Sequence, residues 1–227
     1  CQIRDLLTFW FSTNDTVLKW DQTGNVASLG GTPPVGRGAV FHANRPWVFG
    51  RNAFPSRLYY GSSTSAEDYT GADTGSIDID PEDGDRIVGA ASYKEKLIVF
   101  KGPYRGSIHI ISGTTVATFA RTVLVRGIPL QTHNSILEVS DDIWFMSERA
   151  CHSLAATEQF GNFLGADLTR YLPTYFQSNI NRTYLDRVAG VNYGHIGAAL
   201  WGITPASSTE NTQIFGISYI RAKEEGL

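Results

Sequence analysis

The sequence lacks several features by which whole classes of protein are recognised. Its two cysteines, Cys1 and Cys151, are too few for the disulfide framework of a small secreted domain. It contains no apolar run of about eighteen residues, the length that a membrane-spanning helix needs. Its net charge of -3 argues against nucleic acid as the main partner, because phosphate binding requires a basic surface.

Motifs that hold metals or phosphates are also missing. The histidines are scattered, without the paired spacing of a zinc site. They are His42, His109, His133, His152 and His195. The glycines at residues 30–31 and 36–38 have neither the lysine nor the following helix of a phosphate-binding loop. The sequence therefore predicts no metal centre, no cofactor and no catalytic residue.

The sequence is rich instead in aromatic residues, in glycine and in short apolar runs. Aromatic side chains make up 12% of its 227 residues, and 23 residues are glycine, a combination that favours strands joined by tight turns. The hydrophobic content of 42% and the charged content of 18% are typical of a folded chain and exclude a disordered one.

The stretch 84–112 predicts three short antiparallel strands in succession. Its apolar and β-branched runs fall at residues 87–89, 96–101 and 107–112. Runs of this length, bounded by Gly, Pro and Asp, are typical of strands, and the breakers at residues 102–106 indicate a turn. The stretch therefore predicts one sheet of a repeated antiparallel unit.

Further units of the same plan lie on both sides of this stretch. The units begin near Ala39, Asp85, Ser135 and Arg187, which is a spacing of about fifty residues. A period of this size, with about four strands in each unit, is typical of a β-propeller. One small sheet cannot bury two apolar faces by itself, so successive sheets must cover one another. A β-sandwich or a plain barrel would show similar strands without the period.

The expected fold is an all-β, β-propeller-like array of four-stranded antiparallel sheets, complete or incomplete, in a single domain over residues 1–227. Residues 3–11 and 16–20 predict a hairpin with its turn at residues 12–15. The chain begins with Cys1 and stops just after a predicted strand, so we expect a piece of a longer protein.

One segment departs from the strand pattern. Between residues 165 and 181 the apolar residues recur at a spacing of three and four. They are Leu168, Tyr171, Leu172, Tyr175 and Phe176. This spacing predicts a short helix near residues 167–178, with Asp167 as its N-cap.

Two groups of acidic residues are candidates for binding or catalysis. Asp78, Asp80, Asp83 and Asp85 crowd around one turn, where they form either a cation site or a set of solvated turn acids. The calcium-loop pattern is incomplete, because Asp83 precedes the glycine and no glutamate follows at the twelfth position. The second group could supply paired carboxylates for glycoside hydrolysis, although turn acids are far commoner. Its members are Glu138, Asp141, Asp142 and Glu148.

Cys151 and His152 are neighbours on a predicted strand, so we expect their side chains to point to opposite faces rather than to form a nucleophile pair. Several aromatic residues could face a neighbouring subunit, where Tyr is enriched, or could pack within the sheets. They are Tyr59, Tyr60, Tyr69, Tyr171, Tyr175 and Phe176.

Four stretches carry a family resemblance: NRPWVFG (44–50), RLYYGS (57–62), IDIDPEDGDRIVG (77–89) and LIVFKGP (97–103). In this order they resemble tail proteins of tailed bacteriophages, most of all the nozzle or hub proteins of short-tailed phages. The later stretches IWFMS (143–147) and NTQIFGISY (211–219) are similar to those chains in style. The resemblance extends over residues 39–220 and is sharpest over 46–103.

The resemblance implies a β-propeller with insertions that assembles into a hexameric ring. It implies a structural virion protein of the phage tail, assembled in the host cytoplasm, and not an enzyme. The implied partners are copies of itself, portal or adaptor proteins, tail fibre or needle proteins, and DNA passing through the lumen during ejection without specific binding. The alternative hypothesis is a carbohydrate-binding or glycan-degrading propeller, with aromatic and acidic residues around a central pocket.

Overall fold

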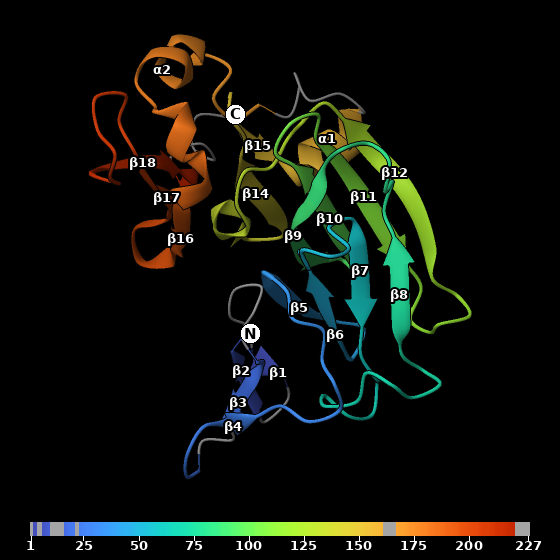
Figure 1. Ribbon diagram of the computed structural model, residues 1–227. Helices are drawn as coiled ribbons and strands as arrows, with labels where there is room; N and C mark the ends of the chain where they lie inside the picture. Colours follow the sequence, from blue (N-terminus) through green and yellow to red (C-terminus); the bar gives the residue numbers. More distant parts are fainter. Residues whose placement is uncertain (1, 4–5, 10–15, 21–22, 161–166, 221–227) are drawn as a thin grey trace. The chain divides into compact units, whose positions relative to one another are not determined.

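The computed structural model describes residues 2–3, 6–9, 16–20, 23–160 and 167–220 (Figure 1). The described chain is mostly β, and each of its five sheets is an antiparallel meander of strands consecutive in the sequence. The chain divides into two compact units, Cys1–Gly127 and Ile128–Leu227. The turn expected at residues 12–15 lies outside the described residues.

The first unit contains three four-stranded sheets. The first sheet consists of β1 (Gln2–Ile3), β2 (Leu6–Phe9), β3 (Leu18–Trp20) and β4 (Ala27–Ser28). The second consists of β5 (Gly38–His42), β6 (Arg45–Phe49), β7 (Arg57–Tyr60) and β8 (Gly75–Asp78). The third consists of β9 (Arg86–Tyr93), β10 (Lys96–Gly102), β11 (Ser107–Ser112) and β12 (Ala120–Arg126).

The second and third sheets share one hydrophobic core. Trp47 and Leu58 of the second sheet pack with Ile87, Leu97 and other apolar residues of the third. Two-residue turns with positive φ close the hairpins β5–β6 and β9–β10, a backbone that matches the twist of the paired strands. These two sheets thus bury an apolar face against one another, as neighbouring sheets of a propeller do.

The second unit contains two three-stranded sheets and two short helices. One sheet consists of β13 (Leu137–Val139), β14 (Asp142–Met146) and β15 (Cys151–Ser153), and the other of β16 (Ala189–Tyr193), β17 (Ala198–Ile203) and β18 (Gln213–Ser218). The helices are α1 (Leu154–Phe160) and α2 (Pro173–Ser178), and 3-10 turns occupy His133–Ser135, Arg182–Arg187 and Gly194–Ile196. Trp144 and Trp201 lie in the core that both sheets share.

The all-β prediction and the fifty-residue period are confirmed. The four later sheets begin at Gly38, Arg86, Leu137 and Ala189, each within two residues of its predicted start. The prediction of four strands per sheet holds in the first unit, whereas the described sheets of the second unit have three. That one domain spans both units stays a prediction.

The helix prediction is correct for its second half only. Helix α2 begins at Pro173, and its N-cap is Leu172 instead of Asp167. The carboxylate of Asp167 accepts hydrogen bonds from the backbone N–H and the hydroxyl of Thr169, which makes a separate turn. Proline fixes φ at a helical value and lacks an N–H, so the first turn is its favoured place.

The sequence pattern does not predict helix α1, which directly follows β15. The backbone N–H of Ala155, in the first turn of α1, donates to the carboxylate of Asp142 on β14 at 2.8 Å. This partner lies thirteen residues away in the sequence. A local cap is also present, because the hydroxyl of Ser153, the residue before α1, accepts the backbone N–H of Ala156 at 3.1 Å.

Candidate functional site

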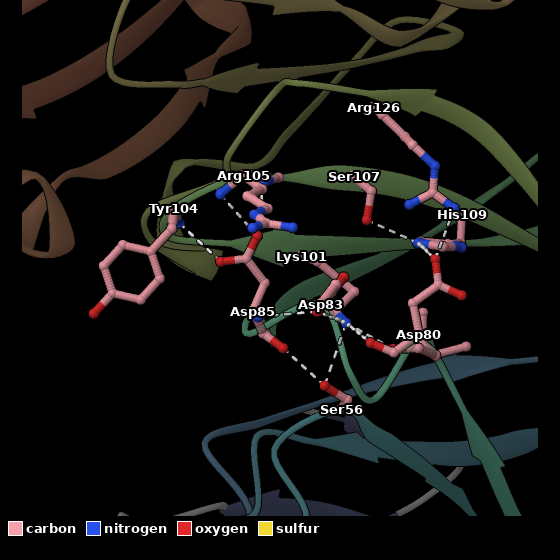
Figure 2. A network of polar contacts seen from close by, with 12 residues as sticks. Ser56, Asp80, Asp83, Asp85, Lys101, Tyr104, Arg105, Ser107, His109 and Arg126 are labelled. Atoms are coloured by element: carbon pink, nitrogen blue, oxygen red, sulfur yellow. Dashed lines mark hydrogen bonds and ion pairs between the residues drawn. The ribbon is translucent and has the colours of Figure 1, made fainter.

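A buried lysine organises the turn between β8 and β9. The side chain of Lys101, on β10, is 0% exposed. Its ammonium group donates to the carboxylate of Asp83 at 2.6 Å and to the backbone oxygens of Ile79 and Asp80 at 2.7 Å each (Figure 2). The hydroxyl of Ser56 lies 3.2 Å from the same nitrogen. The three ammonium protons are thus shared among four acceptors.

Asp85 attaches the β10–β11 hairpin to the same turn. Its carboxylate is buried and accepts the backbone N–H groups of Tyr104, Arg105 and Gly106 at 2.8, 2.9 and 2.7 Å (Figure 2). Hydrogen bonds to an ionised acceptor are stronger than neutral ones. The hairpin is therefore fixed by a residue that precedes β9.

Asp80 forms the charged edge of this network. Its carboxylate pairs with Arg121 and, at 2.9 Å, with Arg126, both on β12. The hydrogen bond from Arg121 is the main cause that lowers the pKa of Asp80 to about 2. The buried imidazole of His109 lies 2.8 Å from the hydroxyl of Ser107 and 3.9 Å from Asp80. Burial lowers the pKa of His109 to about 4, so its ring is neutral at pH 7.

The buried histidines predict that the protein loses stability on acidification. Burial lowers the pKa of His109, His133 and His152 to about 4. In the unfolded chain histidine has a pKa of about 6.5. Between these values the unfolded state binds more protons, so the free energy of unfolding falls as the pH drops from about 6.5 to about 4. Its slope approaches about 1.4 kcal/mol per pH unit for each histidine.

Urea unfolding at a series of pH values through this window measures the effect. The variant His109→Gln should show a shallower slope than the parent protein, because one titrating group is removed. A free energy of unfolding that stays level or rises on acidification would contradict this prediction.

Groups of the protein hold most of the acidic cluster. Basic side chains of the β9–β12 sheet pair with Asp80 and Asp83, whereas backbone N–H groups hold Asp85. The interpretation as solvated acids is wrong for Asp85, which is buried. The exposed Asp78 forms a two-pronged ion pair with Arg57 at 2.6 and 2.9 Å. In the described part of the chain, no three His, Cys, Asp or Glu side chains converge as metal ligands.

Asp142 of the second acidic group caps α1. Its carboxylate accepts from the indole N–H of Trp144 at 3.0 Å and from the hydroxyl of Ser153, in addition to the N–H of Ala155. Its oxygens are thus engaged by donors within the second unit. These contacts give Asp142 a structural role, because its carboxylate caps helix α1 and connects β14 with β15.

The other three acids do not join Asp142. In the β13–β14 register Glu138 pairs with Ile143 and Val139 pairs with Asp142, so Glu138 and Asp142 lie on opposite faces of the sheet. Asp141 is exposed in the turn between the strands, and Glu148 pairs with Arg149. The structure therefore does not assemble Glu138 and Asp142 into the carboxylate pair of a glycosidase.

Cys151 and His152 point to opposite faces, as expected. Cys151 pairs with Met146 in the register and lies in the core, where burial raises the pKa of its thiol. His152 contacts the ring of Phe145 and lies 2.9 Å from the hydroxyl of Ser147. No nucleophile pair forms between the two neighbours.

The aromatic candidates separate into core and surface residues. Tyr60 and Phe176 are buried in the cores of their units, whereas Tyr171 is exposed. Tyr59 and Tyr69 line a pocket of about 650 Å³ in the first unit, together with Arg51 and other residues. The sequence did not predict this pocket, because its lining comes from separate places in the chain, residues 32–35, 51–53, 59–60, 69 and 75.

Compared with protein-family models and with curated proteins, the chain matches none. Among the helices that the structure describes, none is both long and apolar enough to cross a membrane.

Proposed function

We propose that the protein is a structural component of a bacteriophage tail, a subunit of the nozzle or hub ring around the DNA channel. The observation that supports this proposal best is a group of exposed apolar side chains on one sheet face of the second unit. The stretches between residues 46 and 103 that resemble nozzle and hub proteins supply β6 to β10 of the two core-sharing sheets, a fold in keeping with such a ring.

This exposed apolar face belongs to the sheet β16–β18 of the second unit. Its inner side carries Ala199, Trp201 and Ile203, which are buried in the shared core. On its outer side, the register places Leu200 between Val191 and Gly216, and Gly202 between Ala189 and Ile214. We call the outer side the β16–β18 face.

The β16–β18 face is apolar although it is exposed. Val191 is 55% exposed and Ile214 is 73% exposed, and Tyr193 lies on the same side of β16. Glycine and alanine occupy the positions between the larger side chains, so another surface can approach closely. An exposed apolar patch of this kind is typical of a protein interface, and tyrosine is enriched in such interfaces.

In the proposed ring, the β16–β18 face contacts a neighbouring copy of the chain, and six copies follow from the family resemblance. The mildly acidic net charge of -3 suits a channel wall along which polyanionic DNA slides. The further partners we propose are portal or adaptor proteins and tail fibre or needle proteins, in the virion. No catalytic step is part of this function.

The variant Val191→Asp is expected to disrupt assembly. A charge in the centre of an apolar interface must be desolvated without a partner, so we expect subunit association to weaken at least about tenfold. The matched control is Val26→Asp, because Val26 is 51% exposed but lies in the first unit, just before β4. Native mass spectrometry and electron microscopy of the purified proteins measure the oligomers.

The expected result is a ring-sized oligomer for the parent chain and for Val26→Asp, and smaller species for Val191→Asp. A parent chain that stays monomeric at micromolar concentration and does not join virions would refute the proposed function. Rings that form equally well from Val191→Asp would refute only the assignment of this face.

A further inference from the structure

The first unit contains a pocket whose size and lining suit a small ligand. Its volume of about 650 Å³ is within the range of about 300–1,000 Å³ that is usual for ligand sites. Prolines 33 and 34 and the tyrosines 59 and 69 supply flat apolar surfaces. Thr32 and Asn52 add groups that both donate and accept hydrogen bonds.

Arg51 gives this pocket its charge. Among the described residues that line the pocket it is the one charged side chain, and no described carboxylate forms an ion pair with it. Its guanidinium carbon lies 5.7 Å from the ring centre of Phe54 and 5.8 Å from that of Tyr59. These contacts hold the guanidinium beside the aromatic lining. By contrast, the guanidinium of Arg57 is already paired with Asp78.

The lining as a whole selects a ligand with three properties. A guanidinium binds a carboxylate through two parallel hydrogen bonds, so the ligand is an acid. The rings of Tyr59 and Tyr69 favour a partner with a flat apolar face. The hydroxyl of Thr32 and the amide of Asn52 favour a partner with several hydroxyl groups. An acidic sugar combines all three properties in one ring.

We propose that this pocket binds an acidic saccharide, with the carboxylate of a hexuronic-acid unit on Arg51 and the sugar ring against the tyrosines. A nucleotide fits less well. Phosphate sites usually combine several cations or the backbone N–H groups at a helix N-terminus, whereas this pocket presents one arginine and no helix. The proposal is independent of ring assembly, which depends on a different surface.

Calorimetric titration of the purified chain with tetragalacturonate tests the proposal. The controls are the neutral tetrasaccharide maltotetraose and adenosine monophosphate. We expect tetragalacturonate to bind, and maltotetraose and the nucleotide to bind at least about tenfold more weakly, because neither places a carboxylate on Arg51. The variant Arg51→Gln, which removes the guanidinium and its charge but keeps a shorter polar side chain, should lower the affinity for tetragalacturonate at least about tenfold.

The matched control variant is Arg170→Gln. Arg170 is also exposed and stacks on a tyrosine, with its guanidinium carbon 4.8 Å from the ring centre of Tyr171, but it lies in the second unit. Its replacement should leave the affinity unchanged. Equal affinity for maltotetraose, tighter binding of the nucleotide, equal losses in both variants, or no binding of tetragalacturonate at millimolar concentration would each overturn the proposal.

Discussion

Replacing Lys101 with alanine is expected to lower the free energy of unfolding by about 3–5 kcal/mol, the usual result of removing one partner of a buried ion pair. The ammonium group is fully buried and is bonded to the carboxylate of Asp83 and to two backbone oxygens. Without it these acceptors stay in the interior without their donor. Unmet polar groups in such a site are costly because water cannot replace the lost bonds.

Urea unfolding of the parent and variant chains measures this effect. The matched control is Lys96→Ala at the other end of β10, where the side chain is only partly buried. This variant should lower the free energy of unfolding much less than Lys101→Ala does. The variant Lys101→Met separates charge from packing, since it keeps an apolar stem of similar length. Lys101→Met should recover little of the lost free energy of unfolding, because the buried acceptors still have no hydrogen-bond donor.

A double-mutant cycle with Asp83→Asn tests the ion pair itself. Because the two groups are in direct contact, we expect a coupling energy above about 0.5 kcal/mol. If Lys101→Ala costs no more than Lys96→Ala, the turn does not depend on the buried ammonium. The role that we assign to the network would then be wrong.

The strands were predictable because each depends on residues next to one another in the sequence. The apolar runs at residues 87–89 and 96–101 place β9 and β10 without any knowledge of distant contacts, and β9 continues to Tyr93. The fifty-residue period was predictable for the same reason, because it is the recurrence of a local strand pattern. Each sheet built from this pattern must bury an apolar face against the next sheet.

The polar network was not predictable in this way. Lys101 looked like a charged residue that ends an apolar strand. Its acceptors belong to Ser56, Ile79, Asp80 and Asp83, between 18 and 45 residues earlier. One signal could have suggested burial, since Lys101 continues the apolar run of β10. The pocket at Arg51 could not be predicted for a similar reason, because loops and the strands β7 and β8 form it together.

Replacing Asp85 with alanine is expected to cost about 3 kcal/mol or more of the free energy of unfolding. Hydrogen bonds to a charged acceptor contribute about 1.5–3 kcal/mol each, and this carboxylate, which is 3% exposed, accepts three. Water can reach part of the exposed turn and replace some of them, so the loss should be smaller than three full bonds. Asp85→Asn should be damaging as well, because its amide N–H₂ would face backbone donors.

The control for this variant is Asp78→Ala, which removes an exposed carboxylate paired with Arg57 and should cost far less. Hydrogen exchange gives a local measurement. In Asp85→Ala the backbone amides of residues 104–106 should exchange faster than in the parent chain, whereas in Asp78→Ala they should not. Equal exchange in both variants would show that the hairpin does not need the carboxylate.

The hydrogen exchange result bears on how the hairpin presents its surface. Tyr104 is 78% exposed at this turn, and its backbone N–H is one of the three that Asp85 holds at 2.8 Å. An aromatic side chain on a fixed turn loses little conformational entropy when it meets a partner. If Asp85→Ala loosens the turn without unfolding the sheet, Tyr104 is held in place by the network rather than by its own packing. The buried polar network would then determine how an exposed residue of the first unit is presented to other molecules.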